Sequence, residues 1–149
     1  MSILQDCYAI YDKEYAKITA RRVLKDGVAR ELSRNLAFLR AGLAAGLAGA
    51  KIAAGLETQR YDAASAQGLN LDSLRKAALA PATYGPIKEF EKYRGWPTAK
   101  LVHNAYERIV TLQKLAAGDP TLDLTGRLKY LFKYLLLTLA HIEGKTLVD

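Results

Sequence analysis

Positively charged side chains gather along the segment 17–40 in a pattern that suits contact with phosphate groups. Several of them are four residues apart, as are Arg30 and Arg34. Side chains at that spacing share one face of a helix, so a row of them can contact successive phosphates without reading the bases. The same pattern also suits an ordinary solvated helix face. The nucleic-acid contacts predicted in this segment are Arg21, Arg22, Arg30, Arg34 and Arg40, with Lys51 continuing the row.

Cations also stand next to aromatic rings in two later segments. The connection 84–100 interleaves tyrosines and Trp96 with lysines, a mixture that suits single-stranded nucleic acid because bases stack and phosphates need neutralising. Trp96 beside Pro97 instead favours a plug at the end of a helical bundle. Near the carboxyl end, Lys129 and Lys133 lie beside Tyr130, Tyr134 and His141. These two lysines complete the predicted nucleic-acid contacts, although the tyrosines would equally suit packing against a neighbouring helix.

Residues able to perform catalysis or to hold a metal are sparse. The histidines are His103 and His141, and neither follows a glutamate at the Glu-x-x-His spacing that diiron helical bundles use. His103 and Glu107 lie one helical turn apart, which is typical of a helix-surface pair. Cys7 is the single cysteine, which excludes an intrachain disulfide and predicts a buried thiol in a reducing compartment. We therefore expect no catalytic residue, no metal site and no cofactor.

Composition limits the class of protein further. The 149 residues carry 22 lysines and arginines against 15 acids, a net charge of +7, and half of the residues are hydrophobic. Such a chain is long enough for one packed domain, expected over 1–149. Its longest uncharged apolar runs are shorter than the roughly 20 residues that span a bilayer. The expectation is a cytoplasmic protein that does not cross a membrane and whose basic surplus meets nucleic acid or other anions.

The elements that must position these residues are all helical. Hydrophobic periodicity, capping residues and helix-stopping glycines predict long helices over about 3–26, 28 to the mid-fifties, 97–118 and 125–143. Asn70 or Asp72 is expected to cap a short helix, and the proline-rich segment 81–97 to hold one or two helical turns. No segment alternates as a strand does. The predicted fold is an all-α bundle of about four long helices with short helices in the middle connection.

The glycine-rich stretch "RAGLAAGLAGAKIAAG" at 40–55 is expected to belong to the second of these helices. On a continuous helix the leucines from Leu32 to Leu47 form one face, and Gly42, Gly46 and Gly49 lie together on its flank. Three glycines inside a helix would cost about 3 kcal/mol relative to alanine. We therefore expect a close-contact face there, covered by a helix of the same bundle or by a partner subunit.

In helix content, size and charge the chain is similar to the small helical subunits of CRISPR ribonucleoprotein effector complexes, without sharing diagnostic residues. That similarity implies a non-catalytic subunit that binds nucleic-acid backbone and neighbouring subunits. The alternative is a protein-interaction module, such as an oligomeric adaptor, whose basic face meets an acidic protein. Homo-oligomers would suit either hypothesis, and a steep dependence of nucleic-acid affinity on salt would favour the first.

Overall fold

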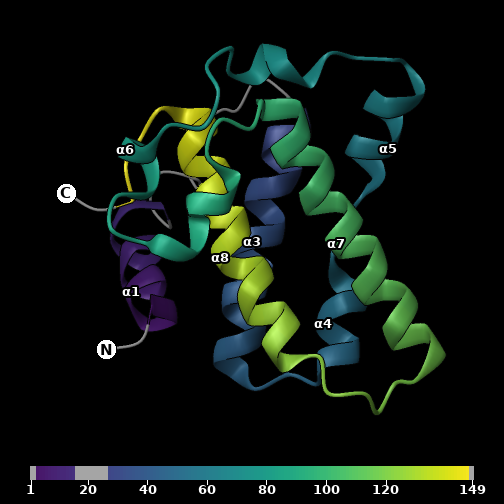
Figure 1. Cartoon of the computed structure of the whole chain (residues 1–149). Helices are drawn as coiled ribbons and strands as arrows, with labels where there is room; N and C mark the ends of the chain where they lie inside the picture. Colours follow the sequence, from purple (N-terminus) through teal and green to yellow (C-terminus); the bar gives the residue numbers. More distant parts are fainter. Residues whose placement is uncertain (1–2, 16–26, 148–149) are drawn as a thin grey trace.

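The protein is built around three long helices, seen in a computed structural model that describes residues 3–15 and 27–147. These are α3 (Gly27–Ala45), α7 (Thr98–Gly118) and α8 (Thr125–Glu143). α8 packs against both α3 and α7, and runs between them and α1 (Ile3–Ile10) in Figure 1. The described residues contain no strand, which confirms the predicted all-α class.

Shorter helices complete the arrangement. α1 continues into a π-helical turn at Tyr11–Tyr15, and α4 (Gly49–Gly55) packs against α7. The remaining short elements lie along the connection from α4 to α7: α5 (Gln59–Ala66), η2 (Leu71–Leu74), α6 (Pro81–Tyr84) and η3 (Lys88–Tyr93). In Figure 1, α5 lies toward the upper end of α7, and α6 lies at the side of the bundle, where it packs against α8.

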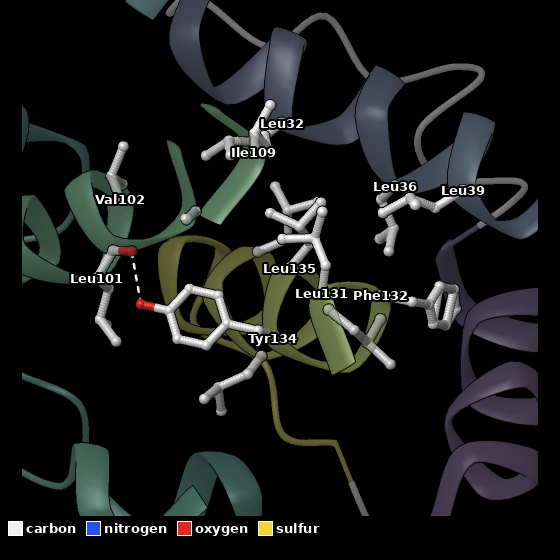
Figure 2. Packing of buried hydrophobic residues seen from close by; sticks show 14 of the residues in the cluster. Leu32, Leu36, Leu39, Leu101, Val102, Ile109, Leu131, Phe132, Tyr134 and Leu135 are labelled. Carbon is white, nitrogen blue, oxygen red and sulfur yellow. Dashed lines mark hydrogen bonds between the residues drawn. The ribbon is translucent and has the colours of Figure 1, made fainter. Parts of the chain in front are cut away.

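α8 is the central helix, and from Leu131 onward it is apolar nearly all round because neighbouring elements cover this part. Every residue from Leu131 to His141 is buried except Lys133. Figure 2 shows two opposite contacts: Tyr134 donates its hydroxyl to the carbonyl of Leu101 in α7 at 2.6 Å, and Phe132 points toward α1. The rings of Tyr8 and Phe132 meet edge to face at 5.0 Å. Tyr134 therefore serves packing, one of the two roles that the sequence leaves open.

The expectation of one continuous helix from Val28 into the mid-fifties is wrong. α3 ends at Ala45, and Gly46 has φ +69°, the left-handed conformation that glycine adopts without strain. The N–H of Leu47 bonds to the carbonyl of Gly42, and that of Gly46 to Leu43, which is the Schellman arrangement of a helix end. Leu47 is consequently 44% exposed instead of joining the buried leucine face. Periodicity alone missed this stop because alanine and leucine continue on both sides of it.

The break also changes the structural roles of the three glycines that were predicted to form a close-contact face. Only Gly42 lies inside α3, whereas Gly46 ends that helix and Gly49 begins α4. The chain turns back here: a Cβ at residue 42 would stand 3.0 Å from Ile52 of α4, and one at residue 49 would stand 3.1 Å from Leu124. Nothing lies within 4 Å of that position at Gly46. The close neighbours of Gly42 and Gly49 are therefore parts of the same chain, and the three glycines do not share one helix flank.

α3 holds the α4–α5 connection through buried polar side chains that sequence reasoning did not single out. Glu31 accepts hydrogen bonds from the N–H groups of Arg60 and Tyr61 at the start of α5, and from the hydroxyl of Tyr106. Asn35 exchanges two 2.8 Å hydrogen bonds with the backbone of Glu57. Burial and the Glu31 carboxylate raise the pKa of Tyr106, so its hydroxyl stays protonated and donates.

The other predicted elements compare closely with the structure. α7 ends at Gly118, and α8 spans 125–143, both as expected. Asn70 accepts a hydrogen bond from the N–H of Asp72, although the helix it caps is a single 3₁₀ turn. Cys7 is buried, and burial raises the pKa of its thiol to about 11. The expected extension of the first helix over 16–26 lies outside the described residues.

Candidate nucleic-acid interface

Two of the predicted arginines of α3, Arg34 and Arg40, contact acidic side chains of the same chain. Arg34 lies 3.1 Å from a carboxylate oxygen of Glu57. Arg40 binds both oxygens of Asp12, with the shorter contact at 2.9 Å, and its guanidinium lies 4.1 Å from the centre of the Tyr8 ring. Arg40 therefore joins α3 to the segment that follows α1. The predicted contacts Arg21 and Arg22 lie outside the described residues.

Arg30 and Arg34 do lie together, in a small polar recess that Arg40 does not line. The recess has a volume of about 190 Å³, and its lining places two carboxylates among three arginines. Glu31 is one of these carboxylates and is already bonded to α5, and Glu57 is the other. The lining residues are Gly27, Arg30, Glu31, Arg34, Glu57, Gln59 and Arg60. Its charge is thus largely balanced within the chain.

The three predicted lysines are separated by the fold. Lys51 is exposed on α4, and Lys129 is exposed on α8. Lys133, one turn further along α8, is mostly buried and lies 2.8 Å from Glu89 of η3. Its charge is therefore matched by a neighbouring carboxylate, and it serves the contact between η3 and α8.

A larger cleft, of about 560 Å³, lies where η3, α7 and the start of α8 meet. It joins two segments that the sequence treats separately, the aromatic connection and the last helix. The polar side chains in its wall are mostly cations, amides and hydroxyls. The lining residues are Lys92, Asn104, Glu107, Arg108, Thr111, Leu112, Gly126, Arg127 and Tyr130.

Two cations of this cleft lie over the aromatic ring of Tyr130. The guanidinium of Arg108 lies 4.7 Å from the centre of the Tyr130 ring, and the ammonium of Lys92 lies 5.2 Å from it. Arg108 also lies 5.6 Å from the ring of Tyr134 and donates to the hydroxyl of Tyr93 at 3.3 Å. Its Nε is buried and has no hydrogen-bond partner. The arginine is thus oriented by aromatic rings, with donor capacity left over.

The tyrosine hydroxyls around Arg108 stay neutral. Burial, followed by the hydrogen bond with Tyr130, raises the pKa of Tyr93 to about 12. Burial likewise raises the pKa of Tyr134. Neither ring supplies a negative charge near neutral pH, so they do not neutralise Arg108.

The charge of the cleft is therefore positive. Lys92, Arg108 and Arg127 face a single carboxylate in the lining, that of Glu107. No carboxylate of the described residues lies within 4.0 Å of those three cations. A concave, cationic surface with an aromatic ring attracts anions and can support stacking.

Groups for acid–base or metal chemistry do not converge at this cleft. His103 bonds to the hydroxyl of Tyr61, and His141 is buried against Thr98 at 2.8 Å. Across the described ranges, no three histidine, cysteine or acidic side chains gather as metal ligands would. In the same part of the chain, no helix is long and apolar enough to cross a membrane.

The sequence pointed to the lysines of the aromatic connection, to which Lys92 belongs, but none of Lys92, Arg108 and Arg127 was among the predicted contacts. The four-residue spacing of Asn104 and Arg108 places them on one face of α7, but that spacing does not show which element packs against this face. The cleft brings these cations together, whereas the six predicted contacts that lie in the described residues do not line one common site. Comparison of the chain with protein families, curated proteins and solved structures returns no match.

Proposed function

We propose that the protein is a non-catalytic nucleic-acid-binding subunit that holds a single strand by its phosphates in the cleft between η3, α7 and α8. The observation that carries this proposal is the state of Arg108. Its guanidinium is oriented on the Tyr130 ring, its Nε has no partner, and it lines a cleft with two further cations. An oriented guanidinium binds phosphate at a lower entropic cost than a free side chain.

The mixture of groups favours a single strand over a duplex. Bases of a single strand are free to stack on an aromatic side chain, and the backbone is flexible enough to enter a concave site. Tyr130 supplies the ring, and Lys92 and Arg127 supply charge beside it. None of these contacts requires a particular base. The expected binding is therefore independent of sequence and strongly dependent on salt.

The net charge of +7 supports the same proposal from the whole chain, because a basic protein attracts nucleic acid at long range. Lys129 is exposed on the helix that carries Arg127, so it can contact phosphates outside the cleft. In its wider form, the proposal places the protein in a larger ribonucleoprotein assembly. There the α3 surface around Arg30 and Arg34 would meet neighbouring subunits.

The experiment is fluorescence anisotropy with a uridine dodecamer carrying a fluorophore at its 3′ end, repeated between 50 and 200 mM salt. Three phosphate contacts predict that log K falls with log salt with a slope of about −2, at about −0.7 per contact for single strands. The double variant Lys92→Glu/Arg127→Glu should bind at least about tenfold more weakly, since two attractive contacts become repulsive.

Lys76→Glu is the matched control, because Lys76 is an exposed cation in the loop after η2 and does not line the cleft. At 200 mM salt, which screens the effect of the altered net charge, its affinity should lie within about twofold of that of the unaltered protein. A slope near zero in the unaltered protein, or equal weakening by the control and the double variant, would overturn the proposal. Thermal melting checks that all three proteins are equally folded.

A further inference from the structure

We infer that the cleft binds the terminal phosphomonoester of a nucleotide chain, with the phosphate at the amino end of α8. This inference rests on the proposed function, since it names the part of the nucleic acid that the same cleft takes. It goes beyond that function because a site for strand ends differs from one for internal backbone.

The first support is the backbone at the start of α8. The first N–H groups of a helix have no carbonyl partner within it, and the helix dipole makes this end positive. Asp123 accepts from the N–H of Thr125 at 3.0 Å. In the described chain, the N–H groups of Gly126 and Arg127 have no acceptor. Both residues line the cleft, so these donors belong to its wall.

The second support is the open space at Gly126. No atom from elsewhere in the described chain lies within 4 Å of where a Cβ of residue 126 would stand. An anion can therefore approach this helix end without a side chain in its way, as phosphates do in other proteins. The backbone does not require glycine at position 126, because Gly126 has no positive φ, and no neighbouring atom would clash with a side chain there. The lack of a side chain therefore matters only for access to the helix end.

The third support is the amount of charge. The cleft lining carries three cations and one carboxylate, which leaves +2. An internal phosphodiester carries one negative charge, whereas a phosphomonoester carries close to two at neutral pH. The charge of the cleft therefore matches a terminal phosphate better than an internal one. Lys133 does not add to this sum, since Glu89 already matches it.

The remaining polar groups suit the nucleotide attached to that phosphate. Glu107 is a hydrogen-bond acceptor and Thr111 is both donor and acceptor, so they can bind sugar hydroxyls. Tyr130 offers a ring beside them for the terminal base. A free nucleoside monophosphate shares this chemistry with the end of a strand, and the experiment distinguishes these two sources.

The experiment is titration calorimetry with unlabelled uridine dodecamers that carry a 5′-phosphate, a 3′-phosphate or only hydroxyl ends, and with uridine monophosphate as a fourth ligand. One of the two phosphorylated oligomers should bind about tenfold more tightly than the hydroxyl form, because its terminal phosphate adds close to two negative charges at a helix end and bidentate contacts with Arg108. Equal affinities for the three oligomers would overturn the inference.

Two variants test the location. Gly126→Leu fills the approach to the helix end, so it should reduce the advantage of the terminal phosphate to less than about twofold. Gly118→Leu is its matched control: residue 118 ends α7, also has open space at the Cβ position, and does not line the cleft. It should keep the full advantage. Retention of the advantage by Gly126→Leu, with an unchanged melting temperature, would place the phosphate elsewhere and overturn the inference.

The outcomes separate this inference from the proposed function. If all oligomers bind equally and with a steep salt dependence, the cleft binds internal backbone: the proposed function stands and the inference fails. If uridine monophosphate binds and no oligomer does, the cleft takes a free nucleotide, and both the inference about strand ends and the proposed function fail. If none of the four ligands binds at 50 mM salt, both fail.

Discussion

The protein has two basic regions that differ in how their charges are matched. On α3, Arg34 and Arg40 bind Glu57 and Asp12. In the cleft, Lys92 and Arg108 lie over aromatic rings, and no described carboxylate lies within 4.0 Å of these two cations or of Arg127. A ring orients a cation without neutralising it, whereas a carboxylate does both. Counting arginines therefore identifies both regions as basic, but only the second keeps its charge for a ligand.

The largest change in affinity is expected when the aromatic ring of Tyr130 is removed. Tyr130→Leu should weaken binding of the uridine dodecamer about tenfold, because stacking on an aromatic side chain contributes about 1–3 kcal/mol per base and Arg108 loses its platform. Anisotropy measures the loss. Tyr130→Phe is the control: it keeps the ring and gives up the hydroxyl contact with Tyr93, so it should bind within about threefold of the unaltered protein. Similar losses in both variants would show that the ring is not the decisive group.

A smaller effect is expected from the carboxylate of the cleft. Glu107→Gln raises the charge of the lining from +2 to +3, so the affinity for the dodecamer should rise about three- to fivefold at 50 mM salt. Because Glu107 is exposed, folding should be little affected. Gain of affinity that persists at 200 mM salt would contradict an electrostatic origin.

The smallest effect is expected on α3. Glu57→Gln removes the charge that matches Arg34, but Arg34 is 64% exposed, and such pairs contribute little. Affinity for the dodecamer should therefore rise by about twofold or less. An increase as large as that of Glu107→Gln would erase the difference between the two regions. Such an increase would indicate that the arginines of α3 form the binding surface.

Particular elements show how much of the fold could be predicted. α7 and α8 matched their expected bounds because each has a turn-forming residue at its ends and a clear apolar period between them. The break at Gly46 was missed because its helix end is made by backbone conformation, and the flanking alanines and leucines suit a helix on both sides. The inner polar contacts of Glu31 and Asn35 were missed because their partners lie more than 20 residues away.

The break at Gly46 determines how the alternative hypothesis, a protein-interaction module, can be tested. Replacing Gly46 by leucine would place a side chain at φ +69°, which strains the fold whether or not a partner binds there. Loss of oligomers in that variant would therefore not reveal an adaptor. Leu47 and Leu122 are exposed and can be altered without that strain, so oligomeric state after their replacement by serine is the better measurement for a protein-interaction module.

By itself, the sequence determined the helical class, the basic charge and the aromatic–cation mixture, since these depend on composition and on local periodicity. Only the tertiary structure decided which cations remain available. Arg40 and Lys133 pair with carboxylates from distant segments, whereas Lys92, Arg108 and Arg127 line one cleft together with Tyr130. The physical reason is that charges interact through space at a few ångströms, and the helix packing sets those distances.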